Sequence, residues 1–347
     1  MMHPGLRKAP LIAVAALTIS TAAQAQDFTF KLHHFLGAKA PAQTEMLEPW
    51  ARAVEERSGG RVKIEIFPAM TLGGRPPELI QQVRDGVVDL VWTVNGYTPG
   101  SFPRSEVFGL PTVFKNDPVA TNLALHDLFE SDLAEEYKGV EVMFLHVHAG
   151  MGIHMRDIPV RRPSELAGTK LRIPSRTGVW IIEALGAIPV AMPVPDLPPS
   201  LQKGVVDGAL IPWEIIPPLK IHEQTDYQIE GFEKERFGTV VFQVSMNKRR
   251  WDGLPEEIQQ AFRDASSRDW WGDVGRIWRT TDDFGIKFAT DQGNIHVTLN
   301  EEETQAFRTA LAPVVGRWIE EVSSQGIDGA ALVRKARGQI AVNSRAN

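Results

Sequence analysis

Apolar and polar positions follow two different periods along the first hundred residues of the chain. Residues 28–34 alternate in a way that predicts a strand, whereas residues 42–58 carry apolar side chains at helical spacing. A strand over 62–67, a helix over 76–85 with proline near its start, and an apolar strand over 87–94 follow. Strands that alternate with helices predict an α/β fold, in which helices cover a sheet containing parallel strands.

Part of this pattern recurs in the second half of the chain. Gly86-Val87-Val88-Asp89 stands between a predicted helix and a predicted strand, and Gly204-Val205-Val206-Asp207 does the same 118 residues later. The strand over 62–67 is matched by residues 170–174. A four-residue match can arise by chance, but with its flanking elements it predicts two similar α/β lobes. Such lobes commonly close over a ligand that binds between them.

The C-terminal third is predicted to be mainly helical. It begins with a strand over 239–246, which a long helical tract over 255–292 follows, broken or kinked near residues 272–275. A helix over 301–324 has Asn300 as its N-cap and several glutamates in its first turn, as capping and the helix dipole favour. A last helix is expected over 330–341.

The first 25 residues have the features of a secretory signal peptide. Arg7 and Lys8 precede an apolar run over residues 11–21, and Ala23-Gln24-Ala25 provides a small-x-small cleavage site. The mature chain is therefore expected to begin at Gln26 or Asp27. The sequence contains no cysteine, so an exported form would have neither disulfides nor a lipid-bearing cysteine. These features favour a free protein in the periplasm of a Gram-negative bacterium.

The charge balance is acidic. The formal net charge is −6, and it becomes −8 without residues 1–25, because that segment contains two cations and no acidic residue. An acidic protein is a poor partner for nucleic acid or for an anionic membrane surface. The remaining chain of about 320 residues is longer than one hydrophobic core usually serves, which favours two domains.

Several kinds of enzyme site are missing from the sequence. It contains no G-x-S-x-G, no phosphate-binding G-x-x-x-x-G-K-[S/T], no H-E-x-x-H and no cysteine nucleophile. His146 and His148 could share a face of a strand and hold a metal together with His154, but ordinary alternation along a strand explains them as well. His33 and His34 call for the same caution, although His34 could line a pocket.

Arg172 is the main candidate for ligand binding. It ends a short apolar strand just before a predicted helix, where open α/β sheets bind their ligands. A guanidinium offers two parallel donors to a carboxylate, and this pair is strong in a dry cleft. The alternative is a solvated arginine at a strand end. Other arginines are expected to be exposed loop charges, namely Arg156, Arg161, Arg162 and Arg176.

Aromatic residues occupy matching places in the two predicted lobes. Trp92 and Tyr97 flank the end of the strand after the first Gly-Val-Val-Asp, and Trp213 follows the strand after the second. Equivalent positions in two lobes would face each other across a cleft. Core packing is the alternative, and it suits Trp92 better than the two residues that lie in predicted loops.

A set of short motifs resembles the DctP-type solute-binding proteins of tripartite ATP-independent periplasmic (TRAP) transporters, over about residues 28–320. The resemblance implies two α/β lobes joined by crossing strands, as in type II periplasmic binding proteins, and a long C-terminal helix that spans both. It also implies that Arg172 pairs with the carboxylate of an organic acid, which the protein delivers to a membrane permease without catalysis. The motifs are Leu72-Gly73-Gly74, residues 83–89, Leu110-Pro111, residues 165–174, residues 201–208 and Met246-Asn247-Lys248.

Departures from the family pattern bear on the ligand. Residues 209–212 are Ala-Leu-Ile-Pro where many members have polar residues. Gly152 stands near the place where sialic-acid binders have a second arginine, and the ligand pattern of the metal-binding keto-acid branch is missing. We therefore expect no metal or other cofactor, and a small monocarboxylate with an apolar or aromatic body. The candidate ligand-binding residues are Arg172 as the anion clamp, Tyr97 and Trp213 as walls, and Asn95, Glu214, His34 and Phe237 as further contacts.

The expected organisation follows from the same resemblance. Residues 27–148 with about 239–278 would form lobe I, and residues 149–238 with about 279–347 would form lobe II, in a protein that is a monomer by default. Other functions remain open: binding a C4-dicarboxylate or another organic acid, serving an ATP-driven transporter or a sensor kinase, or acting as a periplasmic lyase or isomerase.

Overall fold

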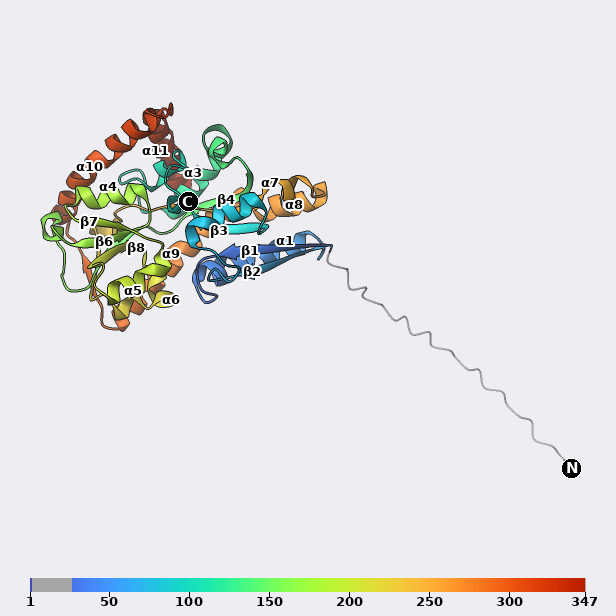
Figure 1. Ribbon diagram of the computed structural model, residues 1–347, viewed down its shortest axis with the longest axis horizontal. Coiled ribbons are helices and arrows are strands. Elements are labelled where there is room, and N and C mark those ends of the chain that lie inside the picture. Colours follow the sequence, from blue (N-terminus) through green and yellow to red (C-terminus); the bar gives the residue numbers. More distant parts are fainter. Residues whose placement is uncertain (2–26, 347) are drawn as a thin grey trace.

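The computed structural model describes Met1 and residues 27–346, so nearly all of the predicted signal peptide and its cleavage point lie outside the described residues. The molecule is built around two separate β-sheets, with helices packed against them (Figure 1). Lobe I is built on a five-stranded sheet of order β2-β1-β3-β10-β4, and lobe II on a six-stranded sheet of order β11-β9-β5-β8-β6-β7. The predicted α/β fold with two sheets is confirmed.

The first sheet consists of β1 (Phe28–His34), β2 (Val62–Phe67), β3 (Leu90–Val94), β4 (Val140–Val147) and β10 (Val241–Asn247). The second consists of β5 (Gly152–Met155), β6 (Lys170–Ile173), β7 (Ile188–Ala191), β8 (Gly208–Ile211), β9 (Tyr227–Glu230) and β11 (Ile295–Thr298). The helices are α1 (Glu48–Arg57), α2 (Leu79–Asp85), α3 (Pro118–Asp127), α4 (Arg176–Ala184), α5 (Leu197–Gln202), α6 (Ile216–Leu219), α7 (Lys248–Asp252), α8 (Glu256–Ala265), α9 (Arg268–Asp291), α10 (Glu301–Ser323) and α11 (Gly329–Ala346). Among the described residues, no helix combines the length and the apolar character that a bilayer crossing needs.

The two lobes repeat one arrangement. In each lobe a strand–helix–strand–helix–strand unit forms three parallel strands, β1, β2 and β3 in lobe I and β6, β7 and β8 in lobe II. The unit therefore matches β1 with β6 and β2 with β7. The predicted correspondence of residues 62–67 with residues 170–174 is wrong, because β6 pairs with both other strands of its unit, as β1 does, whereas β2 pairs within its unit with β1 alone.

The repeated aspartates have the same role in both lobes. A carboxylate oxygen of Asp89 accepts a hydrogen bond from the backbone nitrogen of Lys31 at 2.8 Å, and Asp207 accepts one from Lys170 at the same distance. Each carboxylate thus ties the start of the third strand of its unit to the first. The strand after the first Gly-Val-Val-Asp begins only at Leu90, since Val87 is 64% exposed in the preceding turn.

Chain crossings and one long helix join the lobes. The chain passes from β4 to β5 and returns from β9 to β10, and both β5 and β10 run antiparallel to their neighbours. Helix α9 lies between the sheets (Figure 1), in contact with α3 and β4 on one side and with α6 and residues 213–215 on the other. Helix α10 packs on α4, whereas α11 packs on α3. The exact lobe boundaries stay a prediction.

The helical tract over 255–292 is interrupted earlier than expected. It ends at Ala265 and restarts at Arg268, whereas the helix runs unbroken through Gly272 and Gly275. A Cβ atom at Gly275 would lie 2.6 Å from the backbone of Val119. The prediction of a kink near 272–275 was therefore wrong, because this glycine permits close helix packing and does not break the helix.

Candidate functional site

A small cavity lies where the two lobes meet. It has a volume of about 50 Å³, which leaves room for a small guest, since one water needs about 10–15 Å³. Most of the side chains around it are apolar. The lining residues include Phe35, Trp92, Tyr97 and Phe242 from lobe I and its crossing strands, Met151, Arg172, Val194 and Glu214 from lobe II, and His148 and Trp278.

Arg172 is the only lysine or arginine among the lining residues of this cavity. Arg172 lies on β6 and is 3% exposed. Its Nε donates a hydrogen bond to the carbonyl oxygen of Met192 at 3.0 Å. Its buried Nη2 has no hydrogen-bond partner. Burial lowers the pKa of Arg172, but the guanidinium remains protonated at neutral pH. The side chain is thus a desolvated cation with donor capacity left over, as a carboxylate receptor requires.

The Tyr97 hydroxyl adds a second donor. It accepts a hydrogen bond from the backbone nitrogen of Val194 at 2.9 Å, which leaves its own proton available. Burial raises the pKa of Tyr97, so the phenol is neutral. Because Tyr97 belongs to lobe I and Val194 to lobe II, this hydrogen bond also joins the two lobes beside the cavity.

His148 is a polar residue of the cavity wall whose role sequence reasoning missed. Its Nδ1 accepts a hydrogen bond from the backbone nitrogen of Gly150 at 3.0 Å. Burial lowers the pKa of His148 to about 3, so the ring is neutral and its single proton lies on Nε2. The ring thus offers one N–H donor. The sequence offers one signal for this turn, a glycine two residues after the histidine at a strand end. Gly150 has φ +100°, a conformation that favours glycine, and its backbone N–H reaches His148.

Glu214 lines the cavity in the 3-10 helix Trp213–Ile215, directly after β8. The residue is 6% exposed, and its buried Oε2 has no hydrogen-bond partner. Burial, with the nearby negative charge of Asp282 as a second cause, raises the pKa of Glu214 well above its ordinary value. Burial therefore favours the neutral, protonated form of this carboxyl group.

Of the residues predicted for the site, the structure brings Arg172, Tyr97 and Glu214 together around the cavity and places the other four outside its lining. His34 Nε2 lies 3.1 Å from the side-chain oxygen of Gln43. Asn95 bridges Tyr137 and Gln243, at 2.7 Å from each. Phe237 packs against Phe307 with 5.0 Å between ring centroids.

Trp213 points into the core of lobe II. Its indole nitrogen donates to Gln228 at 2.8 Å, and the guanidinium of Arg236 lies 4.1 Å from a ring centroid. A Cβ atom at Gly152 would lie 2.2 Å from the Trp213 ring, so the tryptophan fills the space that this glycine leaves. The aromatic walls of the cavity come instead from Trp92, whose ring stacks with Phe35 at 4.8 Å and with Phe242 at 5.3 Å between ring centroids.

The candidate metal ligands all have protein partners. The two ring nitrogens of His146 lie 2.9 Å from the indole nitrogens of Trp92 and Trp278, and His154 Nε2 lies 3.1 Å from the carbonyl oxygen of Ile211. Residues 27–346 contain no cluster of three or more histidine or acidic side chains that could hold a metal ion.

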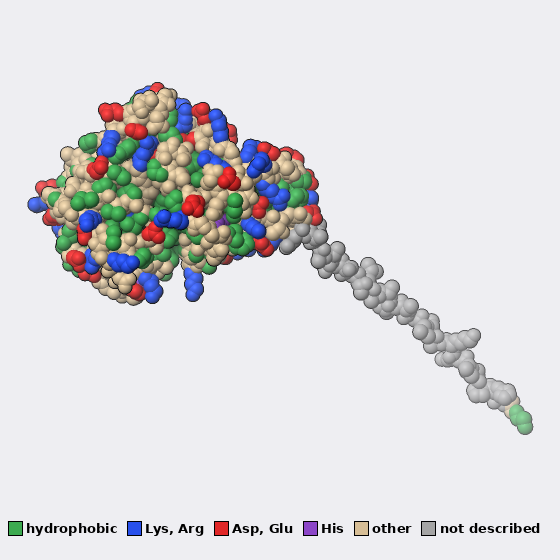
Figure 2. Space-filling view, in the orientation of Figure 1, with side chains coloured by type: hydrophobic (Ala, Val, Ile, Leu, Met, Phe, Trp, Pro, Cys, Tyr) green, Lys and Arg blue, Asp and Glu red, His purple; other side chains and the backbone are tan. Residues whose placement is uncertain are grey.

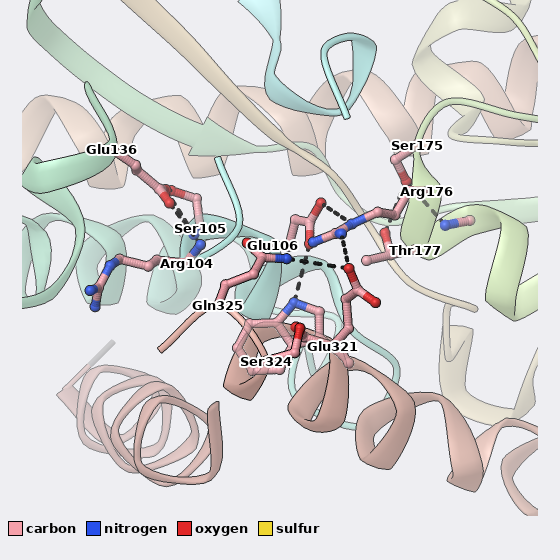
Figure 3. Close-up of polar contacts among 12 residues, drawn as sticks. Arg104, Ser105, Glu106, Glu136, Ser175, Arg176, Thr177, Glu321, Ser324 and Gln325 are labelled. Atoms are coloured by element: carbon pink, nitrogen blue, oxygen red, sulfur yellow. Dashed lines mark hydrogen bonds and ion pairs between the residues drawn. The ribbon is translucent and has the colours of Figure 1, made fainter. Parts of the chain in front are cut away.

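An ion-pair network connects the lobes outside the cavity (Figure 3). The side chain of Arg176, at the start of α4, donates to both carboxylate oxygens of Glu106 in lobe I, at 3.0 and 2.7 Å. It also donates to Glu321 of α10 at 3.0 Å, and the indole nitrogen of Trp318 donates to Glu106 at 3.2 Å. The Arg176 side chain is only 18% exposed, so the prediction of an exposed loop charge was wrong. The charges on the face in Figure 2, by contrast, are scattered and of both signs.

Comparisons with known proteins agree with this architecture. A family model described as bacterial extracellular solute-binding protein, family 7 (DctP) matches residues 32–321. A TRAP solute-binding protein from Rhodoferax ferrireducens, solved with copurified benzoate, is 35% identical with a TM-score of 0.89, covering 92% of this chain and 99% of its own. A marine metagenome TRAP protein specific for aromatic acids, solved with metahydroxyphenylacetate, is 35% identical with a TM-score of 0.88, covering 91% and 99%.

A curated relative has a different ligand. The ectoine/5-hydroxyectoine-binding periplasmic protein UehA of Ruegeria pomeroyi is 26% identical over 339 residues, which is 95% of both chains.

Proposed function

Because this chain belongs to the bacterial extracellular solute-binding proteins of family 7, the DctP family, we propose that it binds a small aromatic monocarboxylate between its lobes and passes it to a TRAP permease. Members of this family bind solutes in the periplasm and are not enzymes, in line with the missing catalytic motifs. The observation that carries the proposal is a buried guanidinium with an unpartnered nitrogen in the wall of an otherwise mostly apolar cavity.

The charges around the cavity favour one carboxylate. Arg172 is the sole cation of the lining, while His148 is neutral. The other buried arginine nearby, Arg236, is already paired with Asp282 at 2.7 Å and with Glu230 at 3.1 Å. A second ligand carboxylate would thus be buried without a countercharge, which costs far more than it returns.

The walls favour a flat ligand body. Trp92 and its two stacked neighbours Phe35 and Phe242 present aromatic surface to the cavity, and Val194 and Ile215 supply apolar surface from lobe II. Removal of such surface from water contributes about 25 cal/mol per Å² of apolar area, against the entropic cost of association. The two solved relatives at 35% identity, which hold benzoate and metahydroxyphenylacetate, support this choice.

A panel of acids tests the proposal. Melting temperatures of the mature protein should rise with benzoate and related aromatic monocarboxylates, because a ligand that binds only the folded state stabilises it. At a ligand concentration 100 times Kd the gain is about 2.7 kcal/mol. Succinate, a sugar acid and ectoine serve as comparisons. A shift with one of these and none with the aromatic acids would contradict the proposal and favour the corresponding alternative ligand class.

Variants of His148 test the number of donors. We propose that its Nε2–H joins Arg172 and Tyr97 in holding the ligand carboxylate. His148→Phe keeps an aromatic ring but removes the donor, so binding should weaken about tenfold, as for the loss of one hydrogen bond to a charged group. The control His148→Gln keeps a donor near the Nε2 position and should stay within about threefold in calorimetry. Equal affinity of wild type and His148→Phe would refute this role.

A further inference from the structure

Glu214 and Arg172 line the same cavity without forming a pair. Nη2 of Arg172 and Oε2 of Glu214 are both buried without a hydrogen-bond partner, so neither satisfies the other. A ligand whose carboxylate lies at Arg172 therefore has another part of its body available for Glu214.

We propose that Glu214 is a specificity-determining residue whose buried carboxyl group hydrogen-bonds a hydroxyl group on the body of the ligand. The preferred ligands are then hydroxy-substituted aromatic monocarboxylic acids. This inference rests on the proposed function, since it needs the carboxylate to be held at Arg172.

The hydrogen-bonding capacity of Glu214 fits a hydroxyl. A neutral carboxyl group has one O–H donor and retains acceptor capacity on its oxygens, and a hydroxyl both donates and accepts. Oε2 of Glu214 is buried and has no partner in the protein, which is costly unless a bound group supplies one. An unsubstituted ring would leave this oxygen unsatisfied, whereas a hydroxyl of suitable position would satisfy it.

The surroundings of Glu214 disfavour other polar groups. A second carboxylate would approach the carboxyl groups of Glu214 and Asp282, and the nearby Arg236 is already engaged with Asp282 and Glu230. A ligand amine is the competing choice, because the neutral amine can accept the Glu214 proton and the resulting ammonium then pairs with the carboxylate. Such a zwitterionic ligand is therefore an arm of the test.

Calorimetric titration of three proteins with three kinds of ligand tests whether Glu214 binds a ligand hydroxyl. The ligands are benzoate, each of the hydroxybenzoate isomers, and 3-(aminomethyl)benzoate; the proteins are wild type, Glu214→Leu and Glu214→Gln. Wild type should bind the best hydroxybenzoate about tenfold more tightly than benzoate, as one added hydrogen bond predicts. Glu214→Leu should lose this preference, so that its affinities for benzoate and for the best hydroxybenzoate agree within about threefold. Glu214→Gln, which keeps a donor and an acceptor, should retain the preference.

Each other result overturns a defined part of the scheme. An unchanged preference for hydroxybenzoate in Glu214→Leu, or an equal loss of affinity for benzoate and hydroxybenzoate, would overturn the role of Glu214 alone. Tightest binding of the aminomethyl compound by wild type would replace the hydroxyl with a cation. If wild type bound neither benzoate nor any hydroxybenzoate, the proposed function itself would fail. Thermal melting without ligand verifies that each variant is folded.

Discussion

Replacing Arg172 with alanine should weaken binding of an aromatic acid by at least about 2 kcal/mol, or roughly 30-fold in Kd. The change removes the only cation of the cavity lining, and the ligand carboxylate would then be desolvated without a countercharge. Calorimetric titration measures the loss directly. Arg161→Ala is a matched control, because Arg161 has a side chain that is 52% exposed and lies outside the cavity lining.

The outcome for Arg172→Ala separates two roles of the arginine. Affinity within twofold of wild type, in a variant that melts normally, would show that the carboxylate lies elsewhere. A large loss in both Arg172→Ala and Arg172→Gln, with an unchanged control, would support charge pairing over simple filling of space, since glutamine keeps much of the volume and one donor group.

The second large effect is expected at Arg236, and it concerns stability. Its side chain is 4% exposed and contacts Asp282 at 2.7 Å and Glu230 at 3.1 Å, while its guanidinium covers the Trp213 ring. Arg236→Ala would leave the buried Asp282 without its cation and Glu230 with His296 alone. We expect the free energy of unfolding at pH 7 to fall by about 3–5 kcal/mol, as for other buried ion pairs that lose one partner. Urea denaturation measures this change.

The pH dependence of that loss has a definite sign. The cation helps to hold the pKa of Glu230 below its ordinary value, against the effect of burial, and it also lowers that of Asp282, which burial raises to about 6. Without Arg236, the pKa of Asp282 rises further above its unfolded value, and the pKa of Glu230 rises from its lowered value, although His296 still lies 2.9 Å from that carboxylate. An acid with a raised folded-state pKa destabilises the fold at high pH and ceases to do so as pH falls. The difference between wild type and variant should therefore shrink from pH 7 to pH 5.

An exposed arginine provides the comparison for Arg236. The Arg279 side chain on α9 is 52% exposed and pairs with Asp117 at 2.9 Å. Arg279→Ala should change the free energy of unfolding by no more than about 0.5 kcal/mol. Equal effects of the two substitutions would mean that the buried cluster contributes no more than a surface ion pair.

The sequence was a good guide to features that depend on periodicity. The strands over 28–34 and 62–67 and the two similar lobes follow from alternation and from the repeated Gly-Val-Val-Asp, whose aspartates have one structural role. The exact matching of strands did not follow, because two units of like composition can be aligned in more than one register. Counting the helices between the strands resolves the register, but that requires the observed element bounds.

The cavity could be predicted only in part. Arg172 and Glu214 stand beside strand ends where ligands bind in α/β sheets, and their residue types suggested the chemistry. Trp213 occupies a similar place yet turns into the core, because Gly152 on the neighbouring strand leaves room for its ring. Which way a side chain at a strand end points thus depends on the size of a neighbour that is distant in sequence. The tautomer of His148 likewise depends on one hydrogen bond from the backbone N–H of Gly150, and no sequence motif predicts this hydrogen bond.

The contact between Glu106 and Arg176 bears on the timing of exchange. It joins the lobes without touching the cavity, so it favours the arrangement with the lobes together whether or not a ligand is inside. We expect a ligand to enter when the lobes separate, so that the association rate levels off at high ligand concentration, at the rate of opening. Departure should meet the same barrier, which would lengthen the residence time of every ligand. A permease that competes for this arginine or its carboxylate partners would speed release without contacting the ligand.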